Sequence, residues 1–300
     1  MARTNTLGNF LTDVASAIRE KKGTTDAILA SNFDTEIASI ESGVDINEYL
    51  SDTITKGTSS SGGWLKTIIK LRSPLTVEGT SAEYMFYQYP LNELPQLDTS
   101  NVTNMSNMFY SCSKLTTIPQ LDTSNVTEMN SMFAYCSKLT TIPQIDTSKV
   151  NSMTYMFGNC SNLTTIPQID TSNVTRIDEM FKYCTNLTTI PQLNGEKLTA
   201  VVGAFNSCKS LENFNGIINL GQEYLTTQSA NYSNYKLDLS SSTKLTEQSI
   251  INILNNLYDI ATKGCNTQTV TLGATNLAKL TSTEGQQALA SAQSKGWNIN

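Results

Sequence analysis

Apolar residues recur in a fixed pattern of 24 positions through the middle of the chain. The first full copy, which begins at Pro95, places them at Leu97, Val102, Met105, Met108, Phe109, Cys112, Leu115 and Ile118. Five copies follow one another without insertion over residues 95–214, and the fifth is decayed. A fixed period in this range is typical of a solenoid, in which each repeat buries its apolar face only against its neighbours.

Each repeat divides into two arms. Met105, Met108, Phe109 and Cys112 follow helical spacing, so we expect a short helix or helical turns there. The following LTTIP, residues 115–119, is short and β-branched, which favours a strand. A Leu-x-x-Ile strand with a helical return arm is the leucine-rich-repeat plan. The pattern therefore predicts an α/β solenoid, a right-handed leucine-rich-repeat-like coil with 24-residue repeats, preceded by a small α-helical anchor.

The two flanks of the repeats differ from the repeats themselves. Residues 64–94 hold a degenerate copy and a predicted first strand at 64–71, so we expect an N-terminal cap. Residues 215–300 predict larger C-terminal coils and a cap. Within that region the pattern favours strands at 237–239, 269–272 and 297–299 and helices at 245–263 and 277–294.

The first 45 residues predict a separate module of two short helices. Their apolar stripes consist of Leu7, Phe10, Leu11, Val14 and Ile18 in the first helix and Phe33, Ile37 and Ile40 in the second. Two such helices bury too little apolar surface to be stable alone, so we expect them to anchor the chain on a partner or to oligomerise. Residues 46–63 are predicted to be a linker, because their end is rich in Gly and Ser.

Composition narrows the possible functions. Charged residues make up 15% of the chain, the net charge is −6 and there is no histidine. This balance argues against binding to nucleic acid or to an anionic membrane, and it removes the usual general base and metal ligand. No run of 18 apolar residues predicts membrane insertion, and the opening MARTNTLGNFLTDV lacks the apolar core of a secretory signal peptide. We expect a non-enzymatic protein without cofactors.

Two polar or reactive residues repeat with the same period. The first set is Cys112, Cys136, Cys160, Cys184 and Cys208. Stacked neighbours have poor disulfide geometry and lack the close spacing of metal ligands, so we interpret these cysteines as small buried packing residues. The second set is Asp98, Asp122, Asp146 and Asp170, followed by Asn194. A bound cation is one interpretation, and side-chain caps of the next turn are the favoured one, because Asn keeps a cap.

The predicted strand arm carries a uniform outer surface. This Thr/Pro row consists of Thr117, Thr141, Thr165 and Thr189 together with Pro119, Pro143 and Pro167. Such a uniform face suits a repetitive ligand such as a polysaccharide. It is also explained by β-propensity at solvated positions, without any ligand. Both interpretations stay open.

The repeat phrase DTSNVTNMSNMFYSCSKLTTI resembles the BspA-type leucine-rich repeats of bacterial and mycoplasmal surface proteins. This resemblance implies adhesion and ligand binding without catalysis. The opening LGNFLTDVASAIREKKGTTDAILASNFDTEIASI is similar to amino-terminal modules of virion proteins in phages of Gram-positive hosts. The closing TLGATNLAKLTSTEGQQALASAQSKGW resembles the end of repeat proteins from the same setting.

Together these resemblances imply a virion structural protein of tail, baseplate or head. Residues 1–45 would bind other virion proteins or form a homo-oligomer, and the repeats would bind a host-surface glycan or protein. The alternatives are a bacterial BspA-like surface adhesin and a purely architectural virion decoration protein. A glycan depolymerase is disfavoured, because glycoside hydrolysis needs two carboxylates at a set separation and Glu128, Asp178 and Glu179 are scattered.

Overall fold

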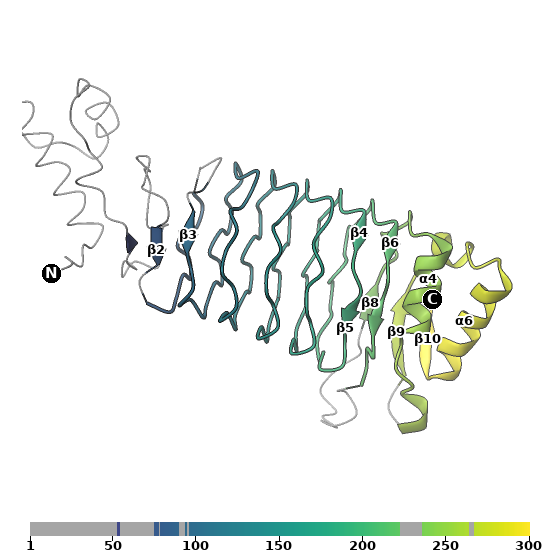
Figure 1. Ribbon diagram of the computed structural model, residues 1–300. Helices are drawn as coiled ribbons and strands as arrows, with labels where there is room; N and C mark the ends of the chain where they lie inside the picture. The colour runs from purple at the N-terminus through teal and green to yellow at the C-terminus, as the bar shows by residue number, and fades with distance from the viewer. Residues whose placement is uncertain are drawn as a thin grey trace, which may run out of the picture.

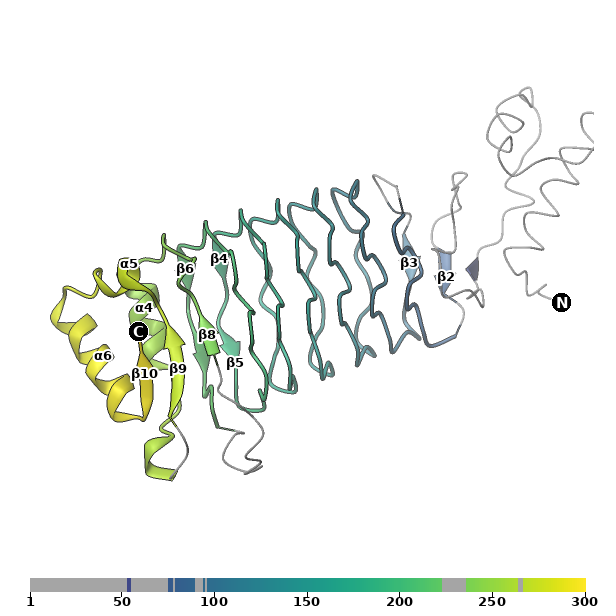
Figure 2. The same cartoon turned by 180° about the vertical axis from the view of Figure 1, so that it is seen from behind.

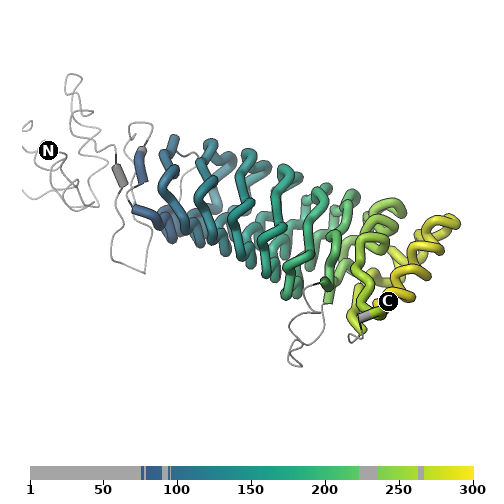
Figure 3. The backbone as a smooth tube through the Cα atoms, turned by 60° about the horizontal axis from the view of Figure 1, so that its bottom comes forward, coloured from purple at the N-terminus to yellow at the C-terminus, as the bar shows by residue number. Residues whose placement is uncertain are grey.

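The repeats fold into successive coils that stand side by side in one row, closed at the far end by a helical cap (Figures 1 and 2). The computed structural model describes residues 53–54, 75–77, 79–89, 94, 96–222, 236–263 and 267–300. The expected helical anchor over residues 1–45 and the expected first strand over residues 64–71 lie outside these ranges. The tube in Figure 3 shows the described coils stacked in the same orientation.

A small parallel sheet opens the row. It consists of β1 (Thr53–Ile54), β2 (Leu75–Val77) and β3 (Leu97–Asp98), in the order β1-β2-β3. Thr53 pairs with Thr76, and Leu75 pairs with Leu97. β1 lies inside the range predicted to be a linker. The Gly/Ser-rich composition covers only the later part of that range, and the β-branched pair Thr53–Ile54 forms a strand instead.

Single backbone bridges, not long strands, connect most coils. One row of parallel bridges joins Asn104, Glu128, Ser152, Arg176 and Ala200, each 24 residues after the last. The prediction of a strand over 115–119 is wrong for that segment and for its next copy. Pairing at this position begins only at Thr165 and Thr189. The proline that ends this segment in every copy, such as Pro119, Pro143 or Pro167, lacks an amide hydrogen, which keeps any pairing here to one or two residues.

Short strands do form where the repeats end. β4 (Thr189–Ile190) pairs with β6 (Asn213–Phe214), and β5 (Leu193–Asn194) pairs with β7 (Ile217–Ile218). Both pairs are parallel and keep the 24-residue register. They therefore continue the same stack toward the cap.

The predicted helical arm is a series of turns. Asn107 and Ser111 have φ angles of 57° and 61°, which an α-helix does not accommodate. As a result, the amides of Asn107 and Phe109 donate to Asn130 and Met132 in the next coil, at 2.8 and 2.9 Å. The amide of Met108 instead closes a local turn onto the Met105 carbonyl at 3.1 Å. The segment is thus neither the predicted helix nor a run of regular helical turns. It is a series of turns with left-handed residues, whose alternate amides bond to the neighbouring coil.

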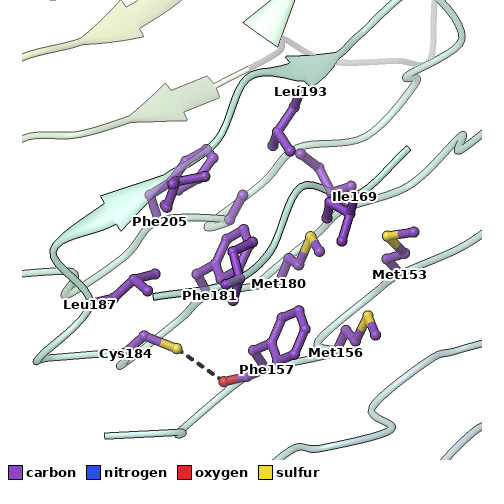
Figure 4. Close-up of a cluster of buried hydrophobic side chains, with 14 of the residues drawn as sticks. Met153, Met156, Phe157, Ile169, Met180, Phe181, Cys184, Leu187, Leu193 and Phe205 are labelled. Carbon is purple, nitrogen blue, oxygen red and sulfur yellow. Dashed lines mark hydrogen bonds between the residues drawn. The ribbon is translucent and has the colours of Figure 1, made fainter. Parts of the chain in front are cut away.

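The core is a column of identical side chains. Phenylalanine rings stack along the row with centroids 5.5–5.8 Å apart and planes within 18° of parallel. The column contains Phe86, Phe109, Phe133, Phe157, Phe181 and Phe205, all fully buried. Figure 4 shows Phe157, Phe181 and Phe205 lying beside Met156 and Met180. Each coil therefore buries its apolar face against its two neighbours, as a solenoid requires.

The cap has a different construction. Its parallel sheet has the order β10-β9-β8, with β8 at Lys236–Asp238, β9 at Gln268–Thr271 and β10 at Trp297–Ile299. These strands confirm the predictions at 237–239, 269–272 and 297–299. The helices are α4 (Glu247–Asn255), η3 (Ala261–Lys263), α5 (Ala274–Leu277) and α6 (Thr283–Ser294). Both predicted helices are too long, and the second is divided because Ser282 caps a new helix.

Candidate ligand-binding faces

The Thr/Pro row lies along one edge of the stack. Thr117, Thr141 and Thr165 are exposed, while Thr189 is half-buried. Pro119, Pro143 and Pro167 are half-buried. The structure therefore brings these seven residues into one line, with one Thr in each successive coil. The expectation that this line binds a ligand stays a prediction.

A shallow open groove of about 700 Å³ lies beside this row. Three coils line it with residues 144–148, 168–171 and 192–194, and Ile218 closes one end. Its glutamine side chains are already ordered, because Gln144 Nε2 donates to the Gln168 carbonyl at 2.8 Å and Gln168 Nε2 to the Gln192 carbonyl at 3.0 Å. This polar ladder fixes the groove before any ligand arrives.

The aspartates at this groove cap turns. Asp146 Oδ1 accepts a hydrogen bond from the Ser148 amide at 2.9 Å, and Asp170 Oδ1 accepts one from the Ser172 amide at 2.8 Å. The hydrogen bonds from Ser148 hold the pKa of Asp146 below its ordinary value. Asn194 makes the equivalent bond to the Glu196 amide at 2.8 Å. The capping hypothesis is confirmed. Within the described ranges, no group of three or more His, Cys, Asp or Glu side chains is placed to hold a metal ion.

A row of buried threonines, one in each coil, runs beneath the groove, and we call it the threonine ladder. Its members are Thr99, Thr123, Thr147 and Thr171. The Thr147 hydroxyl donates to the Asp170 carbonyl at 2.9 Å and accepts from the Asp170 amide at 2.8 Å. One buried hydroxyl thus bonds to both backbone groups of a residue in the next coil and joins the two coils.

The five cysteines that recur every 24 residues are buried free thiols. In each of them Sγ donates to a phenylalanine carbonyl of the preceding coil, as Cys184 does to Phe157 at 3.0 Å (Figure 4). Burial raises the pKa of the Cys112 thiol to about 12. Such thiols are protonated at neutral pH and unreactive. The packing interpretation is therefore confirmed.

The sequence reasoning missed a row of tyrosines on the turn arm. This tyrosine row consists of Tyr84, Tyr87, Tyr110, Tyr135 and Tyr155, whose successive ring centroids lie 5.0–5.8 Å apart. The five residues are spread over three positions of the repeat, with Tyr87 and Tyr110 at one, Tyr84 and Tyr155 at a second and Tyr135 at a third, so no single periodic position marks the row in the sequence. The left-handed turns at Ser111, Tyr135 and Tyr155 bring their side chains together.

A second hollow, of about 440 Å³, lies at the end of the tyrosine row. We call it the tyrosine hollow. It is lined by Ser111, Ser113, Tyr135, Ser137, Asn159, Ser161, Tyr183 and Thr185. Tyr135 and Tyr183 are 39% and 48% exposed, which makes them its most accessible aromatic groups. Every lining side chain is uncharged at neutral pH.

Comparison with known proteins identifies the repeat. A family model described as "Mycoplasma protein of unknown function, DUF285" matches residues 80–189 and 160–235, which together span just over half of the chain. The chain belongs to the DUF285 family. This agrees with the expected likeness to mycoplasmal repeat proteins. No curated protein matches the sequence.

Two solved structures resemble the DUF285 chain. A leucine-rich-repeat protein from T. pallidum is 18% identical, with a TM-score of 0.35, over 52% of this chain and 64% of that one. A leucine-rich cell surface protein from Faecalibacterium prausnitzii A2-165 is 23% identical, with a TM-score of 0.29, over 55% of this chain and 47% of that one. The chain therefore covers less than two thirds of either neighbour.

The carboxylates considered for catalysis are already engaged in the DUF285 repeats. Asp178 forms an ion pair with Arg176 at 2.7 Å, and Glu179 forms one with Lys182 at 3.0 Å. Glu128 accepts hydrogen bonds from Asn130 and Asn151. None of the helices in the described segments has the length and apolarity that crossing a bilayer requires.

Proposed function

We propose that this DUF285 chain is a non-enzymatic adhesion protein whose stacked coils present a ligand-binding surface. The observation that carries the proposal is the pair of preformed open hollows on a repetitive scaffold, one lined by Gln, Thr and Asp and the other by Tyr, Ser and Asn. Their polar groups are ordered by hydrogen bonds between coils, which lowers the entropic cost of binding.

The chemistry of the described residues supports binding better than catalysis. The repeated thiols are buried and protonated, and the repeated carboxylates serve as turn caps. Catalysis of acid–base type needs a titratable group poised near the operating pH and in reach of substrate. The hollows instead offer amide, hydroxyl and phenol groups, which recognise a ligand without transforming it.

We place the protein on a bacterial surface, the alternative reading of the sequence. The DUF285 family description names mycoplasma proteins, which supports a bacterial source, and the resemblance of the repeat phrase to BspA-type surface proteins supports the surface itself. The virion reading gains no such support from the comparisons. Its sequence likeness rests partly on residues 1–45, which lie outside the described ranges, and partly on the closing segment, which folds as the cap.

The function can be tested with the purified full chain. We expect saturable binding to immobilised host glycans or matrix proteins, measured by biolayer interferometry, with no change in the mass of the recovered ligand. Protease treatment of intact producing cells should remove the protein if it lies on their surface. A folded chain that binds none of these ligands would overturn the adhesion function. Protection on intact cells together with recovery in phage particles would overturn the surface placement.

A further inference from the structure

The tyrosine hollow combines two accessible aromatic rings with a neutral polar floor. We propose that it binds a sugar ring of an uncharged glycan between Tyr135 and Tyr183. This inference rests on the proposed adhesion function and names the ligand class and the site. It differs from the expectation for the Thr/Pro row, which lies on the other arm of the coil.

The spacing of the two tyrosines suits a ring held between them. Tyr135 and Tyr183 occupy the same repeat position two coils apart, and Asn159 lies between them in the intermediate coil. Coils one strand spacing apart put two such positions about 10 Å from each other. Apolar atoms in contact lie about 4 Å apart, so a gap of this size accepts one saturated ring with a tyrosine on either side.

The polar groups of the hollow match the rim of a sugar. Serine and threonine hydroxyls both donate and accept hydrogen bonds, as sugar hydroxyls do. Ser111, Ser113, Ser137, Ser161 and Thr185 supply them. A tyrosine ring adds an apolar face for the C–H groups of a pyranose and a phenol at its edge. The hollow therefore offers partners to both the faces and the rim of the ring.

The charge of the surroundings selects against ionic ligands. All eight lining residues have uncharged side chains, and the adjacent Lys182 is paired with Glu179 while its ammonium lies 5.8 Å from the Tyr183 ring centroid. An anionic polysaccharide or nucleic acid in the hollow would lose hydration without gaining a counter-charge from any of the side chains that line it. The net charge of −6 adds a repulsive field. A neutral glycan meets neither penalty.

The hollow is ordered before a ligand enters. The Tyr155 hydroxyl donates to the Tyr135 hydroxyl at 3.1 Å and accepts from Asn159 Nδ2. The Tyr135 ring also lies 5.2 Å from Tyr110 and 5.8 Å from Tyr155. Gly158 makes room for this arrangement, because a Cβ atom there would lie 2.5 Å from the Tyr155 ring. A fixed tyrosine loses little freedom on binding.

The test measures glycan binding by the full chain and its variants on an array of neutral and anionic polysaccharides, followed by calorimetry on the best neutral ligand. We expect Tyr135→Ala and Tyr183→Ala each to weaken binding about tenfold or more, as hot-spot aromatic residues do. Tyr84→Ala is the matched control, because Tyr84 is equally exposed at 39% but lies outside the hollow. It should change the affinity less than about twofold.

A blocking variant keeps the test decisive if removing a tyrosine disturbs the turns. Ser161→Trp fills the hollow and leaves both tyrosines in place, so it should abolish neutral-glycan binding while circular dichroism stays unchanged. Neutral-glycan binding that survives all three hollow variants would overturn the site and leave the adhesion function standing. Saturable binding to proteins or polyanions alone would overturn the ligand class. Binding to no ligand at all would overturn the adhesion function itself.

Discussion

The 24-residue coils and the C-terminal cap are stabilised in different ways within one stack. In the coils, identical side chains in successive turns bond to the backbone of a neighbouring coil: Thr147 bonds to Asp170 in the next coil, and Cys184 bonds to Phe157 in the preceding one. In the cap, helices α4 and α6 pack together beside a three-stranded sheet. Their first turns are capped by Thr246 and Ser282. Regular structure therefore depends on repetition in one region and on helix capping and helix packing in the other.

The difference explains why the buried positions of the repeats vary so little from copy to copy. Each interior residue has the same two neighbours, so one misfit is felt on both sides of its coil. The cap has one free end and varied contacts, such as the bond from Trp297 Nε1 to the Tyr258 carbonyl at 2.8 Å. We therefore expect a destabilising substitution in one coil to destabilise the coils on both sides of it, and a destabilising substitution in the cap to destabilise the cap alone.

The largest effects should come from removing a buried ring in each region. Phe157→Ala deletes a ring that stacks 5.7 Å from Phe133 and 5.5 Å from Phe181. It should lower the free energy of unfolding by about 3–5 kcal/mol. Trp297→Ala should cost a similar amount, about 3–5 kcal/mol, in the cap. Urea denaturation monitored by circular dichroism measures both.

Hydrogen exchange separates the two cases. Phe157→Ala should increase amide exchange in the coils on both sides of residue 157, whereas Trp297→Ala should increase it only beyond residue 236. Val202→Ala is the control, since Val202 is 55% exposed, and should change stability by less than about 0.5 kcal/mol. Equal exchange patterns in the two ring variants would remove the proposed distinction between coil and cap.

A smaller effect tests the threonine ladder of the coils. Thr147→Val keeps the shape of the side chain but leaves the amide and carbonyl of Asp170 without their partner. We expect a loss of about 1–3 kcal/mol in unfolding free energy, the cost of unsatisfied buried groups. Thr141→Val at an exposed position is the matched control and should stay within about 0.5 kcal/mol. Equal losses in both variants would show that the ladder adds nothing to stability.

The sequence predicted the buried positions of the repeat because burial follows directly from the apolar pattern. It predicted a helix wrongly, since apolar residues at Met105, Met108, Phe109 and Cys112 fit both a helix and a series of four-residue turns. The deciding property is the positive φ at Asn107 and Ser111, which the apolar pattern does not encode. A weak signal did exist, because Gly203 stands at the position of Asn107 in the last copy.

The candidate site was less accessible to sequence reasoning than the fold. The Thr/Pro row is periodic and was found, whereas the tyrosine row is not periodic. Tyr135 and Tyr183 do share a repeat position, but Ser111 and Asn159 interrupt it. Tyr155 contacts Tyr135 because the chain makes left-handed turns at both residues and because Gly158 has no side chain to exclude the Tyr155 ring. Contacts between different repeat positions in neighbouring coils require the backbone path, which the pattern of one repeat does not give.

The smallest expected effect concerns a device that the two regions share. Asp146 caps a turn in the coils through Ser148, and Glu247 accepts hydrogen bonds from Ser282 in the cap. Both carboxyl groups have a pKa below the ordinary value because these bonds favour the charged form. A carboxyl group whose pKa is lower in the folded state stabilises the protein at a pH above its unfolded-state pKa, and this contribution is lost as the pH falls through the folded-state pKa.

The urea midpoint should therefore fall as the pH is lowered below about 4. Asp146→Asn and Glu247→Gln should each make this fall shallower, and Val202→Ala should leave it unchanged. If only the coil variant altered the pH dependence, acid sensitivity would belong to the repeats alone, and carboxylate capping would be a further difference between the regions.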